Sequence, residues 1–292
     1  MIAWMKILNQ LKRALAHEYM KYAIYPERKE MLDPHYLQRI AEGAEEIASS
    51  LHEYIIRRII ERMMIRIGRG EEYLFTSADR WQIEIMQDSG ALLEGIIPEI
   101  AKRTKLQQKE IKEAMEEAGI KAVEADDKIY EAAGLSPVPL MESPQLIRLM
   151  QRNYDATLGE WDNYTRTTAD AAQRLFINSC DTAYHKVTSG AVSYTQAVRE
   201  AVDEVVSGGV YVNYTDEETG RVHKDTIETA TARAVRTGVG QATGAISLER
   251  MKEMEWDIIL VSAHLGARTG DGGENPGNHM WWQGKFYSRS GK

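Results

Sequence analysis

The apolar residues between Leu37 and Ile67 recur every three or four positions along the chain. This is the spacing of one face of an α-helix, and it predicts one long helix over this stretch. Thr76, followed three residues later by Asp79, has the spacing of a capping box and predicts a second helix that ends near Gln87.

The pair Thr104 and Gln107 repeats the capping-box spacing. It predicts a third helix that runs to Ala133 with a break near Gly119. Gly134 follows, and prolines at 137, 139 and 144 are incompatible with a continuing helix. We therefore expect residues 134–144 to link two helical regions.

The second half of the chain alternates between helical and extended patterns. Ser193 with Gln196 predicts a helix start, and Gly208 and Gly209 predict its end. A polar turn between two short apolar runs predicts a β-hairpin. The expected elements are helices at 158–187, 193–208 and 226–254, hairpin strands at 210–214 and 221–223, and further strands at 257–263 and 285–288.

The predicted fold class is mainly α, with long amphipathic helices followed by a small α+β unit at the C-terminus. The predicted division is a helical arm at 1–133, the proline-containing linker at 134–144, a helical region at 145–209 and an α+β unit at 210–292. A chain of 292 residues with 43% hydrophobic and 27% charged residues is long and apolar enough for a globular core.

The net charge and the cysteine count disfavour several classes of protein for this chain. The net charge of −8 disfavours a protein that coats nucleic acid over its whole surface. The single cysteine, Cys180, excludes an intramolecular disulfide and indicates a reducing setting. The sequence contains no stretch of about 18 uncharged apolar residues, so we expect no membrane span.

Arg58, Arg62, Arg66 and Arg69 are spaced by four, four and three positions, which places them on one face of the first long helix. Such a stripe is a candidate contact for DNA phosphates or for an acidic partner surface. The alternative is a solvated surface that Glu53 and Glu61 partly neutralise, and the sequence favours neither interpretation.

Two further helical segments carry weaker signals. The first thirty residues combine apolar positions such as Trp4 and Leu11 with Lys12 and Arg13, the pattern of an amphipathic basic helix. It predicts docking into a groove on a partner or on the chain itself, with membrane binding as the alternative. The glycines at 238, 240 and 244 lie within a helical pattern, and their spacing does not fit a dinucleotide-binding loop. Together with Ala234, Ala242 and Ala245 they form a face of small residues, which predicts close approach to a neighbouring helix. Glutamates at 253 and 255 form a Glu-x-Glu pair, which is too common to indicate a transferase site.

The C-terminal segment has the densest collection of chemically active side chains, in a glycine-rich loop between two expected strands. A metal site there would have only His264 and His279 as clear ligands, so we expect none. A triad of Ser262, His264 and Asp271 has no recognisable oxyanion hole. The alternative is a structural role, in which His264 and Arg268 hold the loop by hydrogen bonds. The residues singled out are His264, Gly266, Arg268, His279, Trp282 and Gln283.

The same segment carries a family resemblance. The run from Ser262 to Arg268, then His279 and the Trp-Gln-Gly-Lys sequence at 282–285, resembles the C-terminal signature of the phage minor capsid protein 2 family of tailed bacteriophages. Thr269 stands where that family usually has proline. Further resemblances occur in the same order upstream, at 126–127, 130, 133–135, 165–169, 176–178, 189–190, 193–194, 234–239 and 241.

The resemblance implies a structural protein of the phage head that is bound to the portal vertex in several copies around the portal ring. It implies roles in head assembly and in genome packaging or ejection, production in the host cytoplasm, no cofactor and no catalytic residue. The portal protein is the expected partner, and the major capsid protein and packaged DNA are further candidates. The alternative is a toxin-like transferase or hydrolase with its site at His264, Arg268 and His279.

Overall fold

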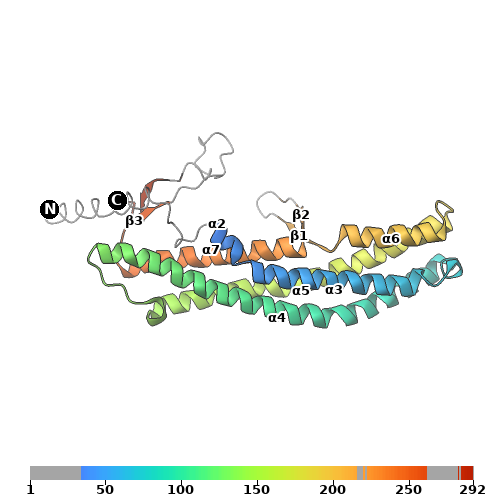
Figure 1. Cartoon of the computed structure of the whole chain (residues 1–292), viewed down its shortest axis with the longest axis horizontal. Helices are drawn as coiled ribbons and strands as arrows, with labels where there is room; N and C mark the ends of the chain where they lie inside the picture. Colours follow the sequence, from blue (N-terminus) through green and yellow to red (C-terminus); the bar gives the residue numbers. More distant parts are fainter. Residues whose placement is uncertain (1–33, 216–219, 221, 262–281, 283, 292) are drawn as a thin grey trace. The chain divides into compact units, whose positions relative to one another are not determined.

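The computed structural model describes residues 34–215, 220, 222–261, 282 and 284–291. Helices dominate these residues, and the predicted fold class is confirmed (Figure 1). The helices are α2 (Pro34–Arg39), α3 (Glu42–Ile67), α4 (Ala78–Ala132), α5 (Pro144–Thr188), α6 (Tyr194–Gly208) and α7 (Ile227–Glu253), with 3₁₀ turns η1 (Glu71–Tyr73) and η2 (Leu140–Glu142). The strands are β1 (Tyr211–Thr215), β2 (Val222–Thr226), β3 (Ile258–Leu260) and β4 (Phe286–Ser288), paired β1 with β2 and β3 with β4, both antiparallel.

The chain forms two compact units. The described residues of the large unit are 34–121 and 148–243, apart from the gaps in the hairpin, and those of the small unit belong to 122–147 and 244–291. The division into domains that follows from the sequence, with a linker at 134–144, stays a prediction.

The core of the large unit follows from the periodicity of α3. Its buried residues fall at nearly every fourth position from Ala44 to Ile67, so that one face of the helix is covered along its whole length. The predicted helix at 37–67 is confirmed apart from a short interruption at residues 40–41 between α2 and α3. The apolar residues that meet this face come from α4, α5 and α6, and they include Trp81, Ile85, Leu92, Ile96, Phe176, Ala197 and Val205.

Helix α4 differs from the prediction, because it is continuous from Ala78 to Ala132 and contains Pro98. The break near Gly119 is absent, and the predicted start at Thr104 is wrong. The side chains of Thr104 and Gln107 are buried and act across helices: Thr104 Oγ1 lies 3.2 Å from Thr165 Oγ1, and Gln107 Nε2 donates to the carbonyl of Ala44 at 3.3 Å.

The segment between α4 and α5 contains the residues that end the first helix and start the second. Gly134 has a φ of 82°, its N–H donates to Glu131, and the N–H of Leu135 donates to Tyr130. This is the Schellman arrangement, which glycine favours because it has no Cβ. Helix α5 then begins at Pro144, well before the predicted start at residue 158, because proline is favoured in the first turn of a helix.

The remaining elements agree with the sequence. Ser193 caps α6 by accepting a hydrogen bond from the N–H of Gln196, as its spacing predicts. The hairpin, α7 and the two short C-terminal strands lie within a few residues of their predicted places.

A histidine holds the junction between α6 and the hairpin. Gly209 ends α6 with a φ of 67°, and the N–H of Val210 donates to His52 Nε2 at 3.0 Å. His52 Nδ1 lies 2.7 Å from Glu228 Oε1 at the start of α7. Because Nε2 accepts a hydrogen bond, the ring proton is on Nδ1 and can be donated to Glu228. The His52 side chain of α3 therefore bonds both Val210 and the first turn of α7.

Replacing Gly209 with alanine will lower the unfolding free energy by about 1–2 kcal/mol, because a left-handed backbone is strained for alanine. A Cβ at this position would also lie 2.9 Å from His52 Nε2. Denaturant unfolding measures the loss. Gly240→Ala is the control, since Gly240 lies inside α7 where a Cβ would meet no atom of the described residues within 4 Å, and this variant should gain up to about 1 kcal/mol. Equal effects of the two substitutions would contradict the role of Gly209.

Candidate interaction surface

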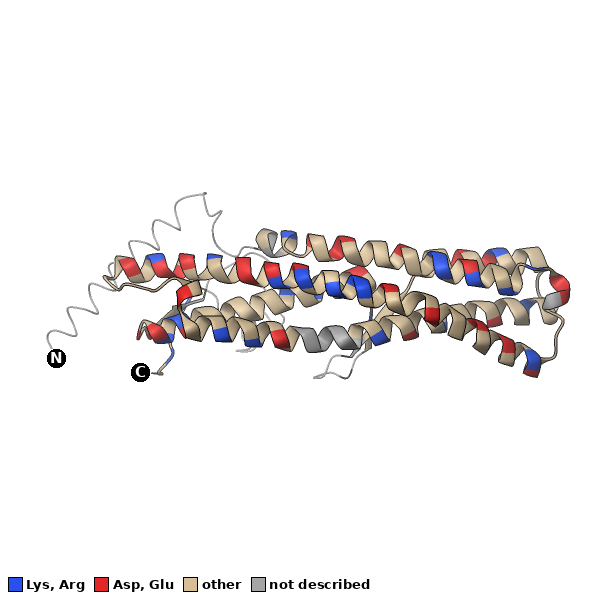
Figure 2. Ribbon diagram, turned by 90° about the horizontal axis from the view of Figure 1, so that it is seen from below, with Lys and Arg blue, Asp and Glu red and all other residues tan. Residues whose placement is uncertain are grey.

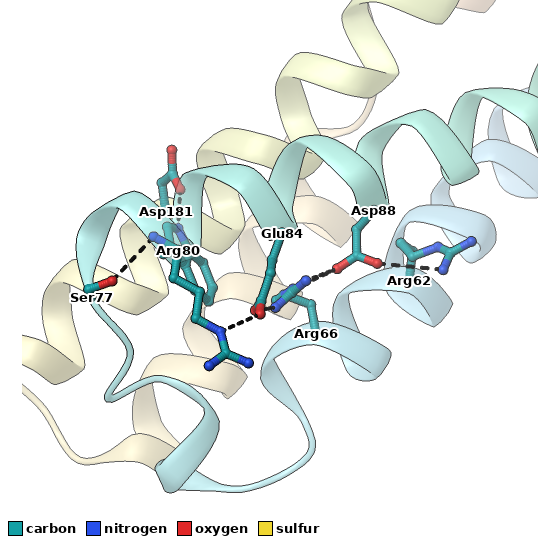
Figure 3. Close-up of polar contacts among 8 residues, drawn as sticks. Arg62, Arg66, Ser77, Arg80, Glu84, Asp88 and Asp181 are labelled. Carbon is teal, nitrogen blue, oxygen red and sulfur yellow. Dashed lines mark hydrogen bonds and ion pairs between the residues drawn. The ribbon is translucent and has the colours of Figure 1, made fainter.

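Two arginines of the predicted stripe bind carboxylates of α4 in the large unit (Figure 3). Arg66 Nη1 lies 2.5 Å from Glu84 Oε2, and Arg66 Nε donates to Asp88 Oδ2 at 2.6 Å. Arg62 Nη1 is 3.7 Å from Asp88 Oδ1, and Arg80 donates to the other oxygen of Glu84 at 2.8 Å. The hydrogen bonds from Arg80 and Arg66 hold the pKa of Glu84 below its usual value. The network therefore fastens α3 to α4.

A buried tryptophan lies beneath this network. The Trp81 side chain is fully buried, and its indole N–H donates to Asp181 Oδ1 on α5 at 2.6 Å. Its ring stacks on Tyr184 with centroids 4.5 Å apart, and the guanidinium of Arg66 lies 5.6 Å from the Trp81 ring centroid. Tyr184 in turn donates to the carbonyl of Thr76, just before α4 begins. Aromatic packing and cation–π attraction thus join α3, α4 and α5.

The stripe is consequently less available to a partner than its spacing indicates. The Arg66 side chain is only 14% exposed, and Arg58 pairs with Glu61 on its own helix at 2.6 Å. The sequence correctly indicated Glu61 as a neutralising residue for this stripe. Arg69 lies exposed in the bend after α3. Figure 2 shows acidic and basic residues interspersed along the helices, and a contact of the stripe with DNA or a partner stays a prediction.

Exposed apolar side chains lie around this end of α3 and the start of α4. Phe75, just after η1, is 61% exposed, and Met64 and Ile65 at the end of α3 are each 43% exposed. Ile83 and Met86 are exposed on α4. Exposed large apolar side chains are candidates for contact with other proteins, and those at the end of α3 and those on α4 are two such sets.

The small unit contains a second polar cluster, centred on a fully buried arginine. Arg250 Nε lies 3.0 Å from Asp127 Oδ1, and Arg250 Nη1 lies 2.9 Å from Glu253 Oε2. Arg250 also donates to the carbonyl of Val138, and Ser143 donates to the other oxygen of Glu253 at 2.5 Å. One guanidinium therefore ties the end of α4, the segment after it and the end of α7 together.

Burial changes the protonation of this cluster. It raises the pKa of Asp127 to about 6, assisted by the carboxylates of Asp126, Glu131 and Glu253 and opposed by the positive charge of Arg250. Burial also raises the pKa of Asp126, which a hydrogen bond from Ser247 and the charge of Arg250 partly offset. The cluster is richer in carboxylates than in cations, so it binds protons more readily than isolated aspartates do.

Replacing Asp127 with asparagine will change how stability depends on pH. The pKa of Asp127 is about 6 in the folded chain and about 3.9 when unfolded. The contribution of the raised Asp127 pKa to the free energy of unfolding is therefore fully present below pH 3.9 and is lost as the pH rises through 6. Unfolding free energies at a series of pH values should show the original chain losing stability relative to Asp127→Asn between about pH 4 and 6. A relative gain over that range would show that the attraction of Arg250 outweighs the cost of burial.

The chain was compared with known protein families, with curated proteins and with solved structures. The sequence model of the family described as Phage minor capsid protein 2 matches residues 32–292. The chain belongs to this family. No curated protein and no solved structure matches the chain significantly. The chain is therefore a structural protein of the phage capsid, as the sequence resemblance implied.

Several of the residues that carried the resemblance have structural roles in this chain. Asp127 binds Arg250, as described above, and the Tyr130 ring meets Trp256 edge to face at 5.6 Å. Tyr194 donates to the carbonyl of Ile67 at 2.8 Å. These contacts join segments far apart in the sequence, which accounts for the residue types without any chemistry.

A buried polar layer in the large unit was missed from the sequence. Gln107 Nε2 lies 3.5 Å from Thr231 Oγ1, and that hydroxyl donates to the Tyr164 hydroxyl at 3.3 Å. Burial raises the pKa of Tyr164 to about 12. Hydrogen bonds between buried polar side chains of this kind help to fix the register of packed helices. Its residues are common in loops and caps, so the sequence alone gives no signal that they meet.

Most of the C-terminal candidate residues lie outside the described part of the chain: His264, Gly266, Arg268, His279 and Gln283, together with Ser262 and Asp271. Trp282 is described. Its ring centroid lies 5.4 Å from that of Tyr287, and the Tyr287 hydroxyl donates to the Trp282 carbonyl. Among the described residues, no three His, Cys, Asp or Glu side chains are grouped as metal ligands. The absence of a metal site, a cofactor and a catalytic role stays a prediction.

The weaker signals also have structural explanations. Glu253 binds Arg250, and Glu255 has a left-handed φ of 52° where α7 ends. Gly238 lies against Thr157, where a Cβ would lie 3.4 Å from the hydroxyl, so close approach is confirmed there. At Gly240 and Gly244 a Cβ would meet no atom of the described residues within 4 Å, so that part of the chain shows no close approach there. The amphipathic segment of the first thirty residues lies outside the described residues.

Cys180 is buried among the apolar residues of the large unit, and burial raises the pKa of its thiol. In the part of the chain that the structure describes, no helix combines the length and the apolar character that crossing a membrane requires.

Proposed function

We propose that the protein is a minor head component that binds the portal protein at the portal vertex and acts in head assembly and in genome packaging or ejection. The observation that carries this proposal is membership of a capsid protein family over residues 32–292. Several copies around the portal ring would each present their helices to the portal.

The docking surface that the described residues favour is the end of α3 with the turn that follows it. Met64, Ile65 and Phe75 expose apolar surface there. The Arg66 network and the buried Trp81 fasten this end of α3 to α4 and α5. A surface held rigidly in this way loses little conformational entropy when a partner covers it.

Mass spectrometry of purified virions and of isolated portal complexes tests the proposal. We expect peptides of the chain in both preparations at a small fraction of the major capsid protein. Their absence from both would refute the assignment, and their presence in virions without the portal complex would refute portal binding.

Surface variants test the docking assignment. Deleting residues 1–75 would not test docking alone, because α3 contributes a fully buried face to the core and its loss would unfold the large unit. The double variant Ile65→Glu, Phe75→Glu should instead fold and fail to co-purify with portal complexes. Leu248→Glu, an exposed position on α7, is the matched control and should still co-purify. Equal recovery of both variants would contradict the docking assignment.

A further inference from the structure

One face of α4 within the large unit exposes large apolar side chains over four turns of helix. Ile83, Met86 and Ile97 are 62%, 54% and 43% exposed, whereas Ile85, Leu92 and Ile96 on the opposite face are buried. Residues 83, 90 and 97 are seven apart, so they lie along one line of the helix. The line is about 21 Å long at 1.5 Å per residue.

Gly90 lies at the middle of this line. A glycine inside a helix costs about 1 kcal/mol relative to alanine. Packing among the described residues does not explain it, because a Cβ at Gly90 would meet none of their atoms within 4 Å. By contrast, the neighbouring Gly95 would bring a Cβ to 3.2 Å from Arg58. The absence of a side chain at Gly90 therefore leaves a gap between two exposed isoleucines that a second helix can approach closely.

The sequence around Gly90 is suited to an antiparallel copy of itself. An axis of twofold symmetry through Gly90 places Ile83 of one copy against Ile97 of the other, because each lies seven residues from the axis. The same symmetry brings Met86 of one copy near Glu94 of the other, and Gln87 beside it can donate to that carboxylate.

The charges at the two ends of the face are opposite. Asp79 lies before the isoleucines and Lys105 after them, both exposed and on the same side of the helix. In the antiparallel arrangement Asp79 of each copy lies one helical turn from Lys105 of the other, within reach of the long lysine side chain. A parallel arrangement would place like charges together and would bring the two Asp79 carboxylates side by side.

We propose that this face of α4, from Asp79 to Lys105, is the contact surface for a second copy of the same chain, and that the two helices pair antiparallel with Gly90 at the crossing point. The contact is isologous, so each copy uses the same residues. It is separate from the docking surface at the end of α3 and does not depend on the proposed portal contact.

Crosslinking through a cysteine at the symmetry axis tests the arrangement. The only native cysteine, Cys180, is buried. Gly90→Cys should therefore give a covalent dimer with a mild oxidant or a short bismaleimide, since the introduced thiols of the two copies meet at the symmetry axis. Gly240→Cys is the matched control, because it too is a helical glycine with open space around it, and it should stay monomeric under the same treatment. Equal crosslinking of the two variants would overturn the proposal.

Sedimentation velocity of the purified chain tests the same contact without crosslinking. We expect a concentration-dependent dimer that Ile83→Glu weakens at least tenfold while helicity by circular dichroism stays unchanged. Asp79→Lys should weaken it less, and adding Lys105→Asp should restore it. A chain that stays monomeric at high micromolar concentration, or a dimer that Ile83→Glu does not affect, would overturn the proposal. So would a monomer whose Ile83→Glu variant has lost binding to portal complexes, which would assign the face to the portal.

Discussion

Replacing Trp81 with alanine will lower the free energy of unfolding by about 3–5 kcal/mol, the range for a buried aromatic residue replaced by alanine. The substitution removes a fully buried ring that stacks on Tyr184 and leaves Asp181 without its indole donor. Arg66 also loses the ring beneath its guanidinium. Denaturant unfolding followed by circular dichroism measures the loss.

Two substitutions on the same helix separate the causes. Trp81→Phe keeps most of the apolar contact and loses the hydrogen bond, so its effect should be about half as large or less. Ile83→Ala removes an exposed side chain and should change stability in dilute solution by less than about 0.5 kcal/mol. If Trp81→Ala costs no more than Ile83→Ala, then Trp81 does not hold the three helices together.

Replacing Arg250 with methionine will have a comparable effect, a loss of about 3–5 kcal/mol, as is typical when one partner of a buried ion pair is removed. Asp127 and Glu253 would keep their carboxylates in a poorly solvated place without the guanidinium, and the carbonyl of Val138 would lose its donor. Thermal and denaturant unfolding at pH 7 measure the change.

The control for this prediction lies on the same helix. Arg236 is exposed on α7, and Arg236→Met should change stability by less than about 0.5 kcal/mol. Combining Arg250→Met with Asp127→Leu removes one of the stranded charges, so the double variant should lose less than Arg250→Met alone. Greater loss in the double variant would show that Asp127 is stabilising for another reason.

The elements that the sequence predicted well are those whose local signals agree with their surroundings. The four-residue spacing of α3 from Ala44 to Ile67 matches its single buried face. Ser193 and Gly209 delimit α6 by capping and by a positive φ, both of which depend on neighbouring residues only. Local chemistry is sufficient in such cases.

Helix α4 was predicted as separate pieces because its local signals conflict with its packing. Gly90, Gly95 and Pro98 all disfavour a helix interior. Leu92, Ile96 and Ile100 between and beyond them are buried in the core of the large unit. Burial of each such side chain stabilises the helix by about 1.5–3 kcal/mol, which outweighs the propensity cost.

The candidate site was only partly predictable for a related reason. The spacing of Arg62 and Arg66 on α3 is repeated by Glu84 and Asp88 on α4, and two antiparallel helices bring such pairs into register. That matching was available in the sequence and was missed. Arg250, by contrast, is an ordinary basic residue near a helix end, and its burial depends on how the end of α4 and the segment after it pack.

The most direct test of the central claim is an electron cryomicroscopy reconstruction of the portal vertex from the intact phage, without imposed icosahedral symmetry. We expect helical density in contact with the portal into which α3, α4 and α5 of the large unit fit, with Met64 and Phe75 at the portal side. A portal vertex at side-chain resolution in which all density belongs to other proteins would contradict the assignment of this chain as a portal-bound minor capsid protein.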